Sequence, residues 1–198
     1  WLMAYDPKKH HRRSIRLRGY DYAQTGLYYV TLCTQDRQRL FGAVVNGEMQ
    51  PGPAGVIAGE CWEWLAARYD HVELDQWVVM PNHLHGIIAL TDRMGTHVTG
   101  ESACRGGSRT APTTGDAKRK PLGRLIGAFK TVSTKRINEL RGTPGAPVWQ
   151  RDFFEHIIRD DNALNRIRQY IQDNPANWAF DTDNPEAMAT AAKDPWRE

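Results

Sequence analysis

The chain of 198 residues contains only three cysteines, Cys33, Cys61 and Cys104, and no two of them are spaced as a ligand pair. This scarcity excludes a disulfide framework and a zinc site built from thiolates. No apolar run approaches the roughly 20 residues that a membrane-spanning helix requires, and no secretory signal is visible. We therefore expect a soluble, cytoplasmic protein that does not contact a membrane.

Charge is distributed unevenly along the chain, although the net charge is only +3. Residues 105–141 contain ten Lys or Arg against two acidic residues, and the chain from Asp173 onward contains six acidic residues against two basic ones. Six more basic residues lie near the N-terminus: Lys8, Lys9, Arg12, Arg13, Arg16 and Arg18. Basic blocks of this kind suit a polyanion, because neutralised phosphates release their counterions. A solvated surface explains either block equally well by itself.

Hydrophobic periodicity predicts one α+β domain at residues 20–180, with a basic arm at 1–19 and a C-terminal tail at 181–198. Residues 94–120 are polar and Gly-rich, which indicates a flexible insertion. The expected elements are a strand at 27–35, a helix at 54–69, a hairpin at 72–80 and 84–91, a helix at 122–140, a strand at 152–159 and a helix capped by 160–162 that ends by Asn174. This order favours a ferredoxin-like sandwich: an antiparallel sheet of about four to five strands with helices mainly on one face.

The hairpin contains a His-Leu-His sequence directly after its Pro81-Asn82 turn. Alternate side chains of a strand share a face, so His83 and His85 point the same way. Two such imidazoles form half of a site for a divalent metal. The pair alone is weak evidence, because this chain has seven histidines.

Two residues of the last helix, Tyr170 and Asn174, are four positions apart and are therefore neighbours on one helical face. Each has a structural explanation, Tyr170 as a boundary aromatic and Asn174 as a C-terminal cap. Together with His83 and His85 they make chemical sense, because two imidazoles and an amide oxygen form an open site that Mg²⁺ or Mn²⁺ can share with a phosphate.

These motifs, taken in order, resemble the single-tyrosine HUH transposases and, more narrowly, the REP-associated tyrosine transposases. The resemblance covers roughly residues 18–178 and rests on four segments: Met-Pro-Asn-His-Leu-His at 80–85, Trp-Gln-Arg at 149–151, Glu-His-Ile-Ile-Arg at 155–159 and Tyr-Ile-Gln-Asp-Asn-Pro at 170–175. It implies that His83 and His85 are metal ligands, Asn174 the third ligand and Tyr170 the nucleophile. The mobile branch usually has Gln where Asn174 stands, so the resemblance favours the domesticated branch.

The family resemblance implies a metal-dependent single-strand DNA endonuclease and strand transferase that acts on hairpin-forming repeats through a 5′-phosphotyrosine, as a monomer or a homodimer. Glu155 and His156, on the strand expected at 152–159, are candidates for support of the metal ligands, and Glu155 is equally a candidate DNA contact. The expected DNA-binding residues are Arg12, Arg13, Arg16, Arg18, Arg124, Lys130 and Lys135. Gly123 and Gly127 weaken the helix at 122–140 and suggest close approach of a backbone or a phosphate there.

Three other functions share some of these sequence features with a nicking enzyme. A regulatory protein that binds DNA hairpins without cleaving them needs the same basic surfaces but forms no covalent adduct. A replication initiator or relaxase of the wider HUH group usually has the tyrosine in other motif contexts. A histidine-triad hydrolase is disfavoured, because Gly86 and Ile87 follow the second His where a third would be needed.

Overall fold

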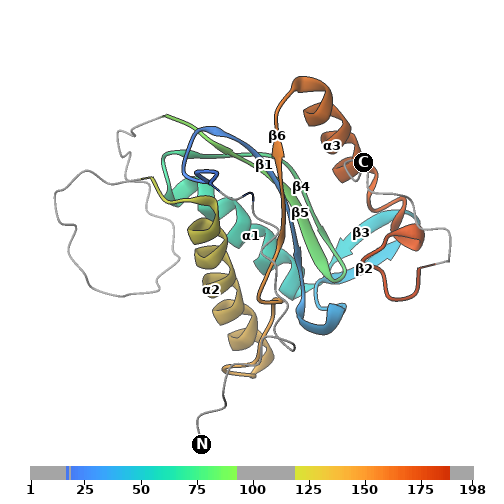
Figure 1. Cartoon of the computed structure of the whole chain (residues 1–198). Coiled ribbons are helices and arrows are strands. Elements are labelled where there is room, and N and C mark those ends of the chain that lie inside the picture. The colour runs from blue at the N-terminus through green and yellow to red at the C-terminus, as the bar shows by residue number, and fades with distance from the viewer. Residues whose placement is uncertain (1–16, 18, 93–118, 188–198) are drawn as a thin grey trace, which may run out of the picture.

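A four-stranded antiparallel sheet in the order β4-β5-β1-β6 forms the centre of the molecule (Figure 1). The computed structural model describes residues 17, 19–92 and 119–187. The sheet strands are β1 (Gly26–Cys33), β4 (Val72–Met80), β5 (His83–Leu90) and β6 (Phe154–Ile158). The helices are α1 (Pro53–Arg68), α2 (Leu122–Arg141) and α3 (Asp161–Asp173). This arrangement confirms the predicted ferredoxin-like α+β fold, and two of these three helices share one face.

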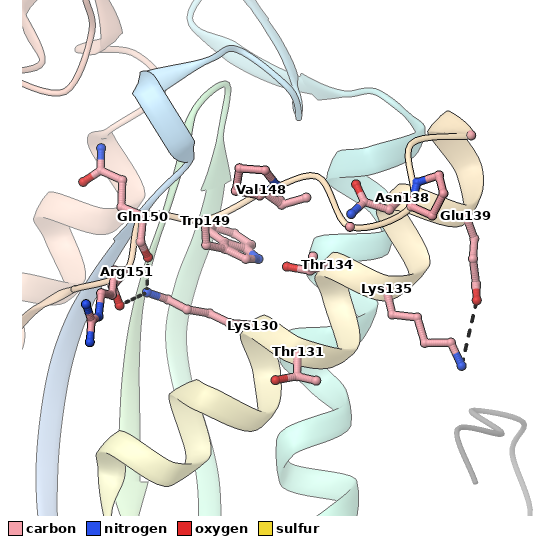
Figure 2. A pocket seen from close by; sticks show the side chains of 14 residues that line it. Lys130, Thr131, Thr134, Lys135, Asn138, Glu139, Val148, Trp149, Gln150 and Arg151 are labelled. Carbon is pink, nitrogen blue, oxygen red and sulfur yellow. Dashed lines mark hydrogen bonds and ion pairs between the residues drawn. The ribbon is translucent and has the colours of Figure 1, made fainter. Parts of the chain in front are cut away.

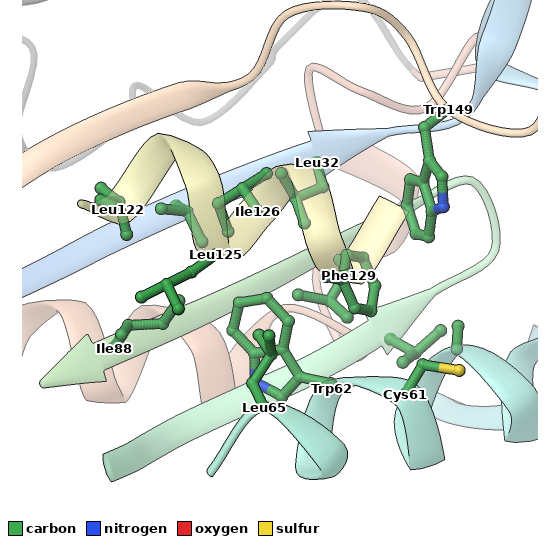
Figure 3. Packing of buried hydrophobic residues seen from close by; sticks show 14 of the residues in the cluster. Leu32, Cys61, Trp62, Leu65, Ile88, Leu122, Leu125, Ile126, Phe129 and Trp149 are labelled. Atoms are coloured by element: carbon green, nitrogen blue, oxygen red, sulfur yellow. The ribbon is translucent and has the colours of Figure 1, made fainter. Parts of the chain in front are cut away.

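Helices α1 and α2 cover one face of the sheet, and α3 covers the other (Figure 1). Figure 3 shows Trp62 of α1 and Phe129 of α2 packed together in the larger core; their rings meet edge to face, with centroids 5.3 Å apart. On the opposite face, Leu164, Ile167 and Ile171 of α3 pack against the sheet. Each face of the sheet therefore packs against an apolar helix surface. The polar side chains that α3 covers are the exception to this packing.

A short hairpin, β2 (Gly42–Val45) and β3 (Glu48–Pro51), lies outside the main sheet and was not predicted. Its turn is Asn46-Gly47, and both residues have positive φ, 53° and 78°. This is the sequence that two-residue hairpin turns prefer. The flanking strands are only four residues long and mostly exposed, so they lack the alternating apolar pattern that would have identified them.

The space beside two glycines, Gly86 and Gly127, predicts opposite effects of an added methyl group on stability. A Cβ at Gly86 in β5 would lie 2.5 Å from the buried Trp62 ring, whereas a Cβ at Gly127 in α2 would meet nothing within 4 Å. We expect Gly86→Ala to lower the free energy of unfolding by about 1–3 kcal/mol through overpacking. Gly127→Ala should raise it by about 1 kcal/mol, because alanine favours the helix. Urea unfolding of both variants measures the difference; equal effects would contradict the described packing.

Candidate metal and nucleophile site

His83 and His85 lie at the start of β5, on the face that α3 covers. Both side chains are buried, with 0% and 2% of their surface exposed, and their ring centroids are 4.4 Å apart. The turn at Pro81-Asn82 places them there, because β4 ends at Met80 and β5 begins at His83. The strand alternation expected from the sequence therefore brings the two imidazoles together.

Each imidazole is oriented by hydrogen bonds to its Nδ1 atom. His83 Nδ1 lies 2.8 Å from Asn82 Oδ1, and His85 Nδ1 lies 2.7 Å from the Tyr29 hydroxyl and 2.9 Å from Thr31 Oγ1. Since Asn82 Oδ1 is an acceptor, Nδ1 of His83 donates, and the lone pair of that ring is on Nε2. Neighbours of this kind fix the ring orientation of histidine ligands in metal sites.

Two further polar side chains come from the end of α3 and the segment after it. Asn174 and Asp181 are 3% and 8% exposed, and Asp181 Oδ2 lies 3.8 Å from His83 Nε2. One ligand atom from each of His83, His85 and Asp181 can be chosen so that all lie within 4.8 Å of one another. Four of the buried side-chain atoms that have no hydrogen-bond partner within the described residues lie here: Nε2 of His83, Nε2 of His85, Oδ1 of Asn174 and Oδ2 of Asp181.

Burial shifts the pKa values of these groups toward the neutral forms. It lowers the pKa of His83 to about 4 and the pKa of His85 well below its ordinary value, and it raises the pKa of Asp181. The nearby Asn174 amide partly offsets the shifts in the pKa values of His83 and Asp181. Both imidazoles are therefore neutral at pH 7, the state in which histidine binds a metal. The donor set, two imidazole nitrogens with an amide and a carboxylate oxygen, fits a divalent cation such as Mn²⁺ or Mg²⁺.

Tyr170 lies directly beside the imidazole pair. Its ring centroid is 5.3 Å from that of His85 and 6.5 Å from that of Tyr29, and its side chain is partly exposed. Helix α3 is held in place by the Asp160 cap at its start and by Arg168, which donates two hydrogen bonds of 2.8 and 2.6 Å to Asp75 of β4. The fold thus places the predicted nucleophile and all three predicted ligands close together within a single chain.

The segment after α3 covers one side of the site, where it packs against the turn that follows β1. Trp178 lies 5.9 Å from the His83 ring, and the Arg39 guanidinium lies over the Trp178 ring. Arg37 forms an ion pair of 3.1 Å with Asp183 and also donates to the Thr182 carbonyl. The first residues of the predicted 181–198 tail therefore pack against the site, and they bring Asp181 into it.

Glu155 and His156 of β6, which were predicted to support the metal ligands, do not orient the two imidazoles. Glu155 pairs in register with Val30, so its side chain lies on the sheet face of α1 and α2, opposite to His85, and its carboxylate oxygens are buried. This corrects the expectation for Glu155 as a supporting residue, and its burial does not favour a DNA contact either. His156 shares the α3 face, opposite Tyr29, but Asn82, Tyr29 and Thr31 hold the two imidazoles.

The predicted DNA-binding residues separate into three groups. Arg12, Arg13, Arg16 and Arg18 lie outside the described residues. Arg124 and Lys135 are exposed on α2, and Lys135 lies 3.9 Å from Glu139. Lys130 instead donates to the carbonyls of Gln150, Arg151 and Asp152, and burial lowers the pKa of its ammonium group to about 8. Its donors are therefore occupied, which corrects the expectation that Lys130 binds DNA.

None of the described helices is long and apolar enough to cross a lipid bilayer. The insertion predicted at 94–120 lies almost entirely outside the described residues, except for its end. There, Arg119 forms an ion pair of 2.7 Å with Asp92, and Lys120 lies over the Tyr69 ring.

Comparisons with known proteins identify a relative in sequence and similar solved structures. No family model matches the chain. An uncharacterized protein of Haemophilus influenzae is 35% identical over 177 residues, which cover 89% of this chain and 95% of that protein. The structure of a REP-associated tyrosine transposase bound to a REP hairpin matches 83% of this chain and 74% of its own, with a TM-score of 0.51 and 18% identity. A candidate transposase of Deinococcus radiodurans matches with a TM-score of 0.43 and 16% identity, over 81% of this chain and 97% of its own.

The relative in sequence and the first similar structure establish different things. Identity of 35% over nearly the whole of both chains shows common family membership, and the match to the hairpin-bound transposase shows a shared fold. The chain therefore belongs to one protein family with the Haemophilus influenzae protein, and its fold is that of the REP-associated tyrosine transposases.

Proposed function

We propose that the protein is a metal-dependent single-strand DNA endonuclease and strand transferase that acts on hairpin-forming repeats, and that Tyr170 is its nucleophile. One observation carries the proposal: the Tyr170 ring packs against His85, beside four buried ligand atoms without a hydrogen-bond partner in the described part of the chain. Packing alone does not explain why a tyrosine lies next to buried imidazole, amide and carboxylate atoms that lack hydrogen-bond partners.

The proposed reaction is a transesterification at one phosphodiester. The Tyr170 phenol loses its proton and its oxygen bonds to the phosphorus, while the bond from phosphorus to the 3′ oxygen of the preceding nucleotide breaks and that oxygen takes up a proton. The product is a 5′-phosphotyrosine and a free 3′ hydroxyl. Since the phosphodiester energy stays in the covalent bond, attack by another 3′ hydroxyl reverses the step and joins the strands.

The residues around Tyr170 have distinct proposed roles. His83, His85, Asn174 and Asp181 would hold one Mg²⁺ or Mn²⁺ ion, which would withdraw charge from the phosphate and favour phenolate attack. A phenol with an ordinary pKa near 10 is a poor nucleophile at neutral pH, so this help is needed. Asn82, Tyr29 and Thr31 hold the imidazoles in orientation. Arg37 and Arg39 pair with Asp183 and Glu186, and so would hold the segment that carries Asp181 against the imidazoles.

The proposed substrate is single-stranded DNA folded into a hairpin. The similar structure of a REP-associated tyrosine transposase is bound to a REP hairpin, and this chain shares its fold. Exposed Arg124 and Lys135 on α2, together with the arm at residues 1–19, provide basic surface for phosphates. A fully paired scissile strand would have to be melted before attack, which favours unpaired DNA.

Affinity for hairpin DNA should depend strongly on salt. If the arm and α2 make six to ten phosphate contacts, affinity for a duplex stem should fall by roughly 10³- to 10⁵-fold between 50 and 200 mM salt, and less for single strands. Removal of residues 1–19 should make the plot of log affinity against log salt less steep. Fluorescence anisotropy over that salt range measures both slopes, and a salt-independent affinity would contradict a phosphate-binding surface.

The direct test of the proposed function is a denaturing gel. The protein is mixed with a fluorescent hairpin with unpaired flanks, with Mn²⁺ or with a chelator. We expect a band of reduced mobility, the covalent protein-DNA complex, only with the metal and only with the folded single strand. Tight binding with no such band would favour the regulatory alternative.

A further inference from the structure

Asn82, in the turn between β4 and β5, contacts each of the three segments that meet around His83. Its side chain is buried, with 1% of its surface exposed. Its Oδ1 lies 2.8 Å from His83 Nδ1, and its Nδ2 donates to the carbonyls of Arg37 and Asp183, at 3.2 and 2.7 Å. An amide has two donor hydrogens and one acceptor oxygen, so both polar atoms of this side chain are used.

The two carbonyls determine which way the Asn82 amide points. A carbonyl oxygen only accepts hydrogen bonds, so the atom that faces both carbonyls is the amide nitrogen, and the amide oxygen faces His83. That oxygen requires a proton on His83 Nδ1 and leaves the lone pair on Nε2. His85 differs, because its Nδ1 faces the hydroxyl groups of Tyr29 and Thr31, which can both donate and accept. Asn82 is therefore the neighbour that decides the tautomer of His83.

The Asp183 carbonyl that Asn82 holds belongs to the segment that brings Asp181 to the site. The backbone N–H of Asp183 donates to Asp181 Oδ1 at 2.6 Å, and Asp181 Oδ2 lies 3.8 Å from His83 Nε2. Asn82 is thus connected to both nitrogens of one imidazole, directly at Nδ1 and through the Asp183 backbone at Nε2. A residue in this position can set the separation of two ligand atoms without binding the metal itself.

The turn after β1 is the third segment that Asn82 holds. Asp36 and Arg37 have positive φ, 54° and 53°, a conformation that non-glycine residues rarely adopt and that persists only where neighbours stabilise it. The Asn82 amide holds the Arg37 carbonyl. The Arg37 side chain in turn pairs with Asp183 and donates to the Thr182 carbonyl. Loss of the Asn82 side chain would therefore release both the turn and the segment after α3 from the imidazole.

We propose that Asn82 is the positioning residue of the metal site: it holds His83 in the tautomer that leaves Nε2 for the metal, and through Asp183 it seats Asp181 beside that nitrogen. This role rests on the proposed function, because it presumes that a divalent metal binds between the imidazoles and Asp181. It has two separate consequences, one for His83 in the metal-free protein and one for metal affinity.

The first test locates the proton on His83 by nitrogen NMR of the metal-free protein at neutral pH. The two ring nitrogens have different chemical shifts when they carry a proton and when they do not. We expect the proton on Nδ1 in the wild type and a mixture of the two tautomers in Asn82→Ala, which removes the acceptor. Asn82→Asp keeps an acceptor oxygen and should keep the proton on Nδ1. A wild type with the proton on Nε2, or an unchanged tautomer in Asn82→Ala, would overturn the proposal.

The second test is a double-mutant cycle on Mn²⁺ affinity, with Asn82→Ala, Asp181→Asn and the two changes together. Electron paramagnetic resonance measures the free Mn²⁺. We expect Asn82→Ala alone to weaken binding by about 10- to 100-fold, the usual effect of residues that support metal ligands. In the Asp181→Asn background the loss should be at least about threefold smaller, because the carboxylate that Asn82 seats is already absent. The same loss in both backgrounds would show that Asn82 does not seat Asp181.

The matched control is Asn138→Ala. Asn138 is also a buried asparagine, 5% exposed, and it lines the pocket between α2 and the segment that leads to β6 (Figure 2). It donates to the Ala146 carbonyl and accepts from the Thr143 hydroxyl, so its removal also leaves a carbonyl without its side-chain partner. The control should keep the wild-type Mn²⁺ affinity and His83 tautomer. A loss of affinity equal to that of Asn82→Ala would assign the effect to destabilisation and overturn the proposal.

Adduct formation on Tyr170 distinguishes failure of this role from failure of the proposed function. If the wild type forms the adduct with hairpin DNA and Mn²⁺ but the results for Asn82 are contrary, only the role of Asn82 is refuted. If the tautomer and the cycle are as expected and no adduct forms, Asn82 positions a metal site and the proposed reaction is refuted. A wild type that binds no Mn²⁺ refutes both.

Discussion

Replacement of Tyr170 by phenylalanine should abolish the covalent protein-DNA adduct and leave hairpin affinity within about twofold of the wild type. The substitution removes only the hydroxyl, and the ring can still pack against His85 and Tyr29. Loss of the nucleophile in a covalent mechanism typically costs several orders of magnitude in rate. The adduct is measured on a denaturing gel with Mn²⁺, and affinity is measured by anisotropy.

The matched control for this variant is Tyr69→Phe. Tyr69 follows α1 and contacts Trp64 and Lys120, away from the imidazole pair. The Tyr69→Phe variant should form the adduct at the wild-type rate. Cleavage by the Tyr170 variant would assign the attack to another residue or to water, and it would remove the basis of the mechanism.

The second large effect concerns the buried ligand atoms. We expect His83→Ala to weaken Mn²⁺ binding by more than about 100-fold and Asp181→Asn by at least about 10-fold, because even supporting residues of metal sites contribute 10- to 100-fold. Asp181→Asn keeps the size of the side chain and removes only its charge, so it separates ligand loss from a folding defect. Isothermal titration with Mn²⁺ at pH 7 measures the affinities.

Glu186→Gln is the control for Asp181→Asn. Glu186 is five residues away in the same segment, is exposed and pairs with Arg39. Its replacement should change Mn²⁺ affinity by no more than a few fold. Equal losses from the Asp181 and Glu186 variants would show that the segment after α3 matters for folding only, and unchanged affinity in Asp181→Asn would remove Asp181 from the ligand set.

Local sequence patterns were sufficient to predict the main elements and which residues share a face within each element, and the family resemblance implied that His83, His85, Tyr170 and Asn174 meet at one site. The strand alternation placed His83 and His85 on one face, and the helical spacing placed Tyr170 and Asn174 on one side of α3. Both patterns act over a few residues, so they can be read without knowledge of the tertiary structure. The observed bounds of α1, Pro53–Arg68, differ from the expected 54–69 by one residue at each end.

The contributions that could not be predicted come from contacts distant in sequence. Asp181 reaches the imidazoles only because the segment after α3 folds back onto Arg37 and Arg39, and no local pattern indicates that return. Tyr29 and Thr31 support His85 through the register of β1 with β5. The same register explains the correction at Glu155: strand alternation fixes its face relative to His156, but only strand pairing shows which face holds the site.

Lys130 shows a similar limit for charged residues. Its place among Arg124 and Lys135 on one helix suggested a surface for phosphates, but its side chain turns toward the backbone at residues 150–152. A charge pattern in sequence does not distinguish a solvated cation from one that holds a loop. The exposed cations of α2 that remain are the ones that the proposed hairpin contact requires.

Mass spectrometry of the covalent product tests directly whether Tyr170 is the nucleophile. Wild-type protein is incubated with Mn²⁺ and a single-stranded hairpin, the DNA is trimmed with nuclease, and the protein is digested to peptides. We predict that the peptide containing Tyr170 carries the mass of a nucleotide 5′-phosphate and that the released DNA ends in a 3′ hydroxyl. Attachment to any other residue, or cleaved DNA with no modified peptide, would contradict it.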